Sequence, residues 1–401
     1  MRKPRLSPPV RRTRRRWRVP PAITHGEEAF EGAGILEEFE GRTGLVLWQA
    51  VRDVALWVSA PEERRGELFR EGAETRQRDA VQGERLEAAV ERPLLELSEL
   101  LGHPHALTCE LAASACLQVA QWADERGARA TALAFAQSAG YAAPMDAATA
   151  YTVARLARRR AEFARAESWF RRTVALARQT GDWNAYSMAF LGLGNLYVQR
   201  GNLPVARRFY VRALRSARRH SLHGAAGMAF HDLLVLSVAA GRADDVERYA
   251  RGAYDEYGSD HPRLPALAHD VAYFWMERGY HARALLIFRA LLPHIPSSGE
   301  RVLVLANIAR AEAAAGDRAR FEEAWTQVWD GVEGAEGSAE ALVELARGAA
   351  SLADWARAER AAERALAISS DRGEAKSQLA AEAALEAVLE HRATEATPAP
   401  G

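Results

Sequence analysis

The chain has 401 residues, 48% of them hydrophobic and 26% charged, a composition that permits a large core and is ordinary for a soluble protein. Its 53 basic and 53 acidic residues balance, but residues 1–24 hold nine bases and no acid, so the remainder carries an excess of nine acids. Lys3 and Lys376 are the only lysines, and this Arg- and Ala-rich text indicates a GC-rich bacterial genome. Cys109 and Cys116 are too far apart on a helix for a disulfide, about 10 Å between Cα atoms, which favours packed thiols in a reducing compartment.

Residues 1–24 are predicted to form a disordered basic arm, because they combine Arg with Pro and have almost no apolar side chain to bury. Through residues 2–18 this arm has the charge to contact nucleic acid or an acidic partner. Two other interpretations stay open: the arm folds back onto the acidic stretch 27–40, or it reflects an upstream start codon. The basic N-terminal residues are followed by a Pro-rich segment and not by the apolar segment of a signal peptide, so we predict no secretory signal. The most apolar window, 45–58, is interrupted by charges and is shorter than a membrane span of about 20 residues, so we expect a cytoplasmic protein without membrane contact.

Residues 25–104 form a separate N-terminal helical region that lacks the repeat pattern found later in the chain. Helical spacing of apolar residues predicts one helix over 45–58, a second helix after Pro61, and a mostly polar third helix over 74–90. Pro93 is expected to open a short fourth helix. We interpret the region as a cap that covers the apolar face at the end of a helical array.

The stretch 187–220 is predicted to fold as two helices joined by a Gly201-Asn202 turn. With Ser187 as position 1, characteristic side chains stand at fixed places: Phe190 at 4, Gly194 at 8, Tyr197 at 11, Ala206 at 20, Tyr210 at 24 and Ala213 at 27. This pattern resembles the tetratricopeptide repeat, a helical hairpin of about 34 residues that stacks on copies of itself.

The same pattern recurs as seven hairpins through residues 105–372. Position 20, where the two helices press closest, is occupied by Ala132, Ala166, Ala206, Val246, Ala284, Phe321 and Ala358. Position 15 holds a turn glycine in five hairpins: Gly127, Gly201, Gly241, Gly279 and Gly316. Position 24 holds an aromatic residue in four: Phe170, Tyr210, Phe288 and Trp325. Because Val246 and Phe321 replace a small residue and Glu312 puts an acid at position 11, we expect those hairpins to pack less regularly.

Beyond the repeats, residues 373–391 are predicted to form an amphipathic capping helix, and residues 392–401 a disordered tail. The resemblance and these flanking segments together predict an all-α, tetratricopeptide-like α-solenoid of about seven helical hairpins with an N-terminal helical cap region and a C-terminal capping helix.

The resemblance also implies a partner-binding groove lined by the first helix of each hairpin, at positions 2, 5, 9, 12 and 13. Carried over to this sequence, those positions present Tyr151, Arg155, Arg158, Arg159, Leu191, Asn195, Gln199, His231, Val235, His269, Tyr273, Met276, Glu277 and Arg310. This mixture of side chains suits an extended peptide with acidic or polar groups.

Structural alternatives to these binding roles stay open. Asn195 either holds a peptide backbone or bonds a neighbouring helix, since buried amides usually find internal partners. The basic run at Arg155 to Arg160 either receives an anionic group or is a solvated helix face. His231 and His269, each followed by Asp, indicate peptide contact or hydrogen bonds between helices more than a divalent metal site, because no third ligand group accompanies them.

No phosphate-binding glycine loop, nucleophile elbow or metal-ligand set is present, so we predict no enzymatic activity and no cofactor. The function expected is that of a non-enzymatic scaffold or adaptor that binds a protein or an extended peptide through the concave face of its repeats. The alternative is a transcriptional or nucleic-acid-associated regulator, with the basic arm on nucleic acid and the repeats sensing a partner. Repeat spacings near 40 residues resemble those of bacterial regulatory repeat proteins.

Overall fold

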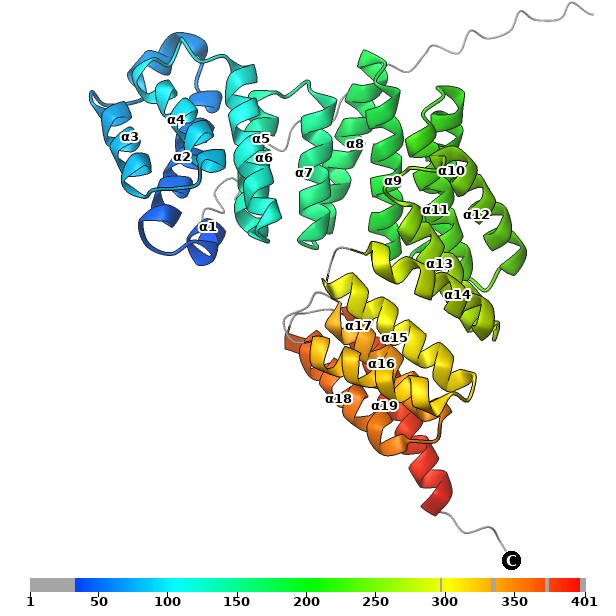
Figure 1. Ribbon diagram of the computed structural model, residues 1–401. Helices are drawn as coiled ribbons and strands as arrows, with labels where there is room; N and C mark the ends of the chain where they lie inside the picture. Colours follow the sequence, from blue (N-terminus) through cyan, green and yellow to red (C-terminus); the bar gives the residue numbers. More distant parts are fainter. Residues whose placement is uncertain (1–32, 296–297, 333–336, 372–374, 397–401) are drawn as a thin grey trace, which may run out of the picture. The chain divides into compact units, whose positions relative to one another are not determined.

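The computed structural model describes residues 33–295, 298–332, 337–371 and 375–396, and all regular structure in these ranges is helical (Figure 1). The basic arm predicted at residues 1–24 lies outside the described residues, so that prediction stays untested. The described chain divides into two compact units, residues 1–229 and residues 230–401, and each is described by itself below.

Four α-helices and a short 3₁₀-helix precede the repeats: α1 (Ala33–Glu38), α2 (Gly41–Ser59), η2 (Glu62–Glu67), α3 (Ala73–Gly83) and α4 (Ala88–Gly102). The first helices of the seven hairpins are α5 (Cys109–Glu125), α7 (Ala147–Arg159), α9 (Trp183–Gln199), α11 (His223–Ala239), α13 (Leu264–Glu277), α15 (Ser298–Ala314) and α17 (Ser338–Ser351). The second helices are α6 (Arg129–Ala142), α8 (Phe163–Thr180), α10 (Leu203–Arg219), α12 (Ala243–Tyr257), α14 (His281–Leu291), α16 (Arg318–Gly331) and α18 (Trp355–Asp371). A short 3₁₀-helix, η3 (Leu292–His294), follows α14, and α19 (Ala375–Ala396) ends the described chain.

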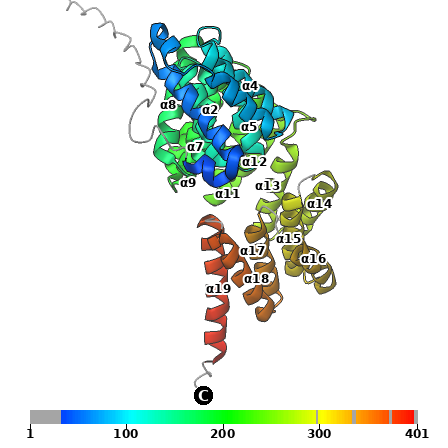
Figure 2. The same cartoon turned by 90° about the vertical axis from the view of Figure 1, so that its left-hand side faces the viewer.

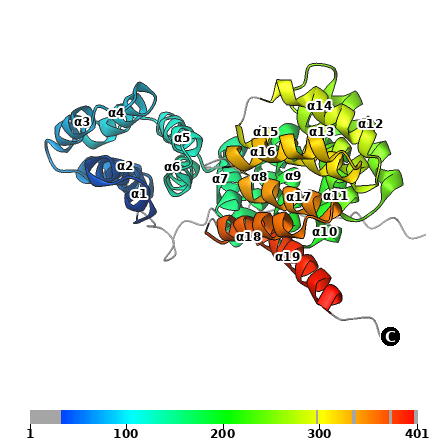
Figure 3. The same ribbon diagram turned by 60° about the horizontal axis from the view of Figure 1, so that its bottom comes forward.

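In the first unit, each hairpin packs its two helices together and the next hairpin packs on it, so that α5 to α10 form a continuous stack. The N-terminal helices cover the start of this stack, because α4 packs on α5 while α1 and α2 pack on α6. Figure 3 shows α2 beside α3 and α4. The apolar end of the array, which would otherwise face water, is therefore covered.

In the second unit, α15, α16, α17 and α18 form one hydrophobic core that includes Phe321, Trp325 and Leu342. Helix α19 packs along α17 and α18 (Figure 2), and buries Ala381 and Val388 against that core. The helix runs to Ala396, beyond the end expected at residue 391.

All seven hairpin turns share one backbone geometry. In each, the N–H of position 16 donates to the C=O of position 11; the donors are Ala128, Glu162, Asn202, Arg242, Tyr280, Asp317 and Asp354, at 2.8 to 3.0 Å. The residue at position 15 has a left-handed backbone conformation in all seven hairpins. It is glycine in the five hairpins where the sequence has a turn glycine, and it is Ala161 (φ 59°) or Ala353 (φ 58°) in the other two. This combination is the Schellman motif, which satisfies carbonyls at a helix end.

Glycines and aromatic rings interlock between the helices of the stack. A Cβ atom on Gly192 would lie 2.2 Å from the ring of Phe170, and one on Gly194 would lie 2.2 Å from the ring of Tyr210. The glycines at these two positions therefore serve packing, and for Gly194 the repeat pattern predicts this role. At the irregular sixth hairpin, Phe321 is fully buried and lies against Gly348 of α17, where a Cβ atom would be 3.1 Å from the Phe321 ring.

Two helix boundaries differ from the sequence prediction. The helix predicted over 74–90 is two helices, because α3 ends at Gly83 and Arg85 takes a positive φ of 49° before α4 begins. Pro93 lies inside α4 and not at its start.

Candidate partner-binding surface

The residues predicted to line the groove all lie on first helices, and six of the fourteen contact a neighbouring hairpin. On α7, Arg155 and Arg159 both reach the carboxylate of Asp124 in α5, at 3.3 and 2.5 Å. Their side chains stay 38% and 35% exposed, so these ion pairs are open to solvent and contribute little stability. The basic charge of this helix is therefore partly neutralised by the preceding hairpin.

The other two residues predicted on α7, Tyr151 and Arg158, are half-buried. The ring of Tyr151 lies 6.0 Å from that of Phe170 in a tilted arrangement. Tyr151 therefore has a structural role in the second hairpin, and both side chains keep partial access to its surface.

On α9, Asn195 uses its carbonyl oxygen inside the hairpin, because the Tyr210 hydroxyl donates to Oδ1 at 2.6 Å. Its Nδ2 has no hydrogen-bond partner among the residues that the structure describes. Gln199, one turn further on, is exposed. Leu191 was also expected to face a ligand, but it is buried, with 3% of its surface exposed. Among the predicted groove positions of α9, the donor groups open to a partner are therefore those of Asn195 and Gln199.

In the second unit, a chain of polar side chains crosses three successive first helices. His231 of α11 lies 2.8 Å from Oδ2 of Asp270 in α13, and His269 lies 3.3 Å from its Oδ1. The other ring nitrogen of His269 lies 3.0 Å from Nδ2 of Asn307 in α15. Tyr257 of α12 completes the chain at 3.5 Å from His231 Nδ1. These side chains form a hydrogen-bond network between helices, which is the structural alternative given above for the two histidines.

A second network connects α13, α15 and α17. Arg310 reaches Glu277 and Glu344, each at 2.6 Å, and Glu344 also accepts from Arg347 at 2.7 Å. Burial, reinforced by the negative charges of Glu344 and Glu277, raises the pKa of Tyr273 to about 12. Tyr273 is therefore a neutral hydroxyl at physiological pH, able to donate or accept a hydrogen bond.

Other predicted groove positions in this unit divide between burial and exposure. Met276 is 2% exposed and belongs to the core, while Val235 is 46% exposed. Glu312, the acid at position 11 of the sixth hairpin, is buried and pairs with Arg289 and Arg320. This pairing explains how an acid replaces the usual apolar side chain there.

Three side chains that contact these groove residues, the acids Asp124 and Glu344 and the amide Asn307, were not predicted as part of the surface. Asp124, Glu344 and Asn307 lie at positions 12, 6 and 6 of their hairpins, and only the stacking of hairpins brings them to their partners. In the described residues no group of three or more His, Cys, Asp or Glu side chains is arranged to hold a metal ion. No helix among them is long and apolar enough to cross a membrane.

These hairpins define the class: a helical-repeat protein whose first helices carry polar side chains. Residues 146–219, which contain α7 to α10, match the tetratricopeptide repeat family model, so this segment consists of tetratricopeptide repeats. Repeats of this family typically mediate protein–protein interactions. A comparison with curated protein sequences finds no match.

Several solved structures are similar at low identity. A tetratricopeptide repeat protein from Parabacteroides merdae has 14% identity and a TM-score of 0.49, covering 69% of this chain and 99% of that one. BtubC from P. vanneervenii has 16% identity and a TM-score of 0.43, covering 57% and 94%. PilF of Pseudomonas aeruginosa has 15% identity and a TM-score of 0.44, covering 58% and 97%.

Proposed function

We propose that this protein is a non-enzymatic scaffold or adaptor of the bacterial regulatory type that binds a partner protein or extended peptide through the first helices of its repeats. The observation that carries the proposal is the family match over residues 146–219, in which α9 presents the unpartnered Nδ2 of Asn195 beside the exposed Gln199. Arg155 and Arg159 on the neighbouring α7 keep about a third of their surface exposed and add positive charge beside these amides.

The chemistry of this surface fits an extended peptide. Amide N–H groups donate to main-chain carbonyl groups. Two guanidinium groups that share one carboxylate can also donate to a second carboxylate, supplied by a partner. A rigid stack of hairpins holds these groups in place before the ligand arrives, which lowers the entropic cost of binding.

Site-specific photo-crosslinking tests the surface directly. A benzoylphenylalanine is placed at position 199 on α9 or at position 208 on α10, where Gln199 and Arg208 are both exposed but lie on the first and second helix of one hairpin. The partner is first captured by affinity purification from the cells that express the chain. We expect crosslinks to it from position 199 and not from position 208; equal crosslinking, or crosslinking from position 208 alone, contradicts the proposal.

The second candidate function uses the basic arm. Nine positive charges without an acid in residues 1–24 favour nucleic-acid contact through residues 2–18, which would make the protein a nucleic-acid-associated regulator. We expect deletion of residues 1–24 to abolish salt-dependent retention on a nucleic-acid column while the repeat domain keeps its protein partner. Unchanged retention after the deletion excludes this function.

A further inference from the structure

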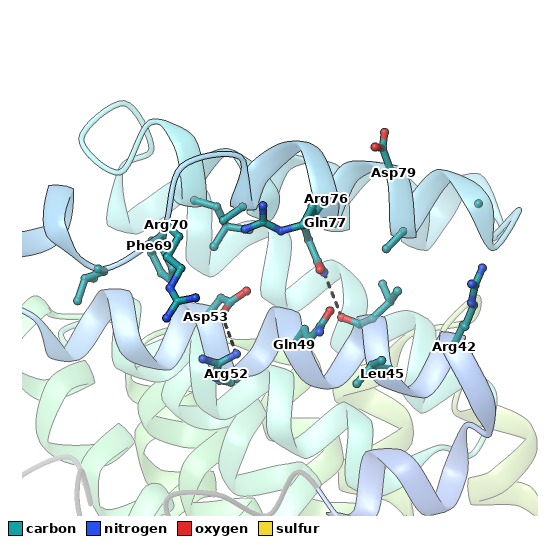
Figure 4. A pocket seen from close by; sticks show the side chains of 16 residues that line it. Arg42, Leu45, Gln49, Arg52, Asp53, Phe69, Arg70, Arg76, Gln77 and Asp79 are labelled. Carbon is teal, nitrogen blue, oxygen red and sulfur yellow. Dashed lines mark hydrogen bonds and ion pairs between the residues drawn. The ribbon is translucent and has the colours of Figure 1, made fainter.

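A cleft of about 840 Å³ lies between α2 and α3, outside the seven hairpins (Figure 4). Helix α2 forms one wall and α3 the other, and Leu101 of α4 contributes to the lining. The two walls are fixed to each other, because the buried Gln77 of α3 donates to the backbone carbonyl of Val46 in α2 at 3.4 Å. The cleft is therefore a preformed feature of the N-terminal region.

Arginine dominates the charge of this cleft. Four arginines line it against two aspartates: Arg42, Arg52, Arg70 and Arg76 against Asp53 and Asp79. The side chains of Arg42 and Arg70 are exposed and form no ion pair or hydrogen bond with any residue in the described ranges. The side chain of Arg76 donates only to the backbone carbonyl of Glu71, at 3.4 Å, and Nη1 of Arg52 lies 3.9 Å from the Asp53 carboxylate.

This lack of partners contrasts with the arginines on the repeats. There, Arg155, Arg159 and Arg310 each reach one or two carboxylates supplied by neighbouring hairpins. The cleft therefore holds guanidinium groups whose capacity for carboxylate remains unused within the described chain.

We propose that the cleft between α2 and α3 binds an acidic segment of a partner protein. This site lies outside the repeats and is separate from the surface assigned above to partner binding. Arg42 and Arg52 are ten residues apart on α2, about 15 Å along the helix axis. An extended chain advances about 3.3 Å per residue, so two carboxylates four or five residues apart match this spacing.

The cleft fits a peptide better than a small anion, because its arginines are far apart and part of its lining is apolar. Figure 4 shows Arg42 and Arg70 at opposite ends of the cleft, so the guanidinium groups do not converge on one point. Leu45, which is 45% exposed, and Phe69 also line the cleft and offer contact for apolar side chains. A ligand with apolar residues between its acids satisfies both features.

Fluorescence anisotropy of the full chain with a labelled peptide tests the proposal. The probe is Gly-Glu-Leu-Ala-Leu-Glu-Gly, and its counterpart carries Gln in place of Glu. We expect the double variant Arg42→Glu/Arg70→Glu to weaken binding of the Glu peptide at least about tenfold, and Asp53→Asn to strengthen it about threefold, since a like charge is removed. The Gln peptide should bind at least about tenfold more weakly than the Glu peptide.

The matched control is Arg64→Glu/Arg92→Glu, which makes the same change in net charge at two exposed arginines of the same region that do not line the cleft. We expect it to change the affinity less than about twofold. Equal weakening by this control, equal binding of the Gln peptide, or inorganic phosphate or an oligothymidylate binding more tightly than the peptide overturns the proposal. Arg42→Gln/Arg70→Gln replaces the charge reversal if that variant loses its helicity.

Discussion

His231 in α11 and Asp270 in α13 form a hydrogen bond between successive hairpins, with Nε2 and Oδ2 2.8 Å apart. Burial would raise the pKa of Asp270, but hydrogen bonds and positive charge from His231 and His269 outweigh it and lower that pKa to about 2. Because the pKa is lower in the folded than in the unfolded chain, the carboxylate stabilises the fold above about pH 4. That stabilisation is lost as the pH falls through about 2.

We therefore expect Asp270→Asn to lower the free energy of unfolding by about 1–2 kcal/mol at pH 6, with a smaller difference from the wild type at pH 3. Urea unfolding followed by circular dichroism measures both values. Asp330→Asn is the control, since Asp330 is exposed and forms no ion pair with the residues described. A loss that is equal at pH 3 and pH 6 contradicts the assigned role of the carboxylate charge.

The two alanines at hairpin-turn position 15 are strained where the other five hairpins have glycine. Ala161 is exposed and has a φ of 59°, a conformation that costs a residue with a Cβ atom about 1–2 kcal/mol. We expect Ala161→Gly to raise the free energy of unfolding by about 1 kcal/mol, the reverse of the usual effect of glycine. Ala164→Gly, at an exposed position inside α8, should lower it by about 0.5 kcal/mol. A decrease for both variants, measured by urea unfolding, refutes the interpretation.

Gly194 and Tyr210 give the test of packing inside the third hairpin. A Cβ atom on Gly194 would lie 2.2 Å from the Tyr210 ring, so Gly194→Ala should destabilise the protein by about 2–3 kcal/mol. The loss should be less than additive with Tyr210→Ala, because that variant removes the ring that the new methyl group strikes. Gly83→Ala is the control, since nothing lies within 4 Å of its Cβ position. Full additivity in the thermal unfolding of the double variant contradicts the contact.

The repeat positions were predictable because each depends on local geometry. A turn that needs a positive φ selects glycine, and a close helix contact selects alanine, so Gly127 and Ala132 show their roles in the sequence. The pattern also locates the turns that lack glycine, since Ala161 and Ala353 stand at the same position of their hairpins.

The partners of the surface residues were not predictable in the same way. Arg155 meets Asp124 31 residues earlier, and Arg310 meets Glu344 34 residues later, and each pair depends on how one hairpin is rotated on the next. No sequence pattern indicated the cleft between α2 and α3. Arg42 and Arg70 belong to a region with no repeat that would indicate that they line one cleft.

Asp53 makes stability depend on pH in the opposite direction to Asp270. Its side chain is 13% exposed, and burial raises its pKa to about 6 despite the opposing charge of Arg52. Because the folded chain favours the neutral acid, ionisation destabilises the fold. The penalty is absent below about pH 4, grows as the pH rises towards 6 and is fully present above it.

We expect Asp53→Asn to raise the free energy of unfolding by about 1–2 kcal/mol at pH 8 and to change it by less than about 0.5 kcal/mol at pH 4, measured by urea unfolding at both values. Asp79→Asn is the matched control, because Asp79 lines the same cleft but is exposed, and we expect little change at either pH. If Asp53→Asn raises the free energy of unfolding equally at pH 4 and pH 8, the cause is the packing of the amide and not the removal of the charge. A gain confined to high pH would show that the folded protein tolerates a costly buried charge in the cleft that we assign to an acidic ligand.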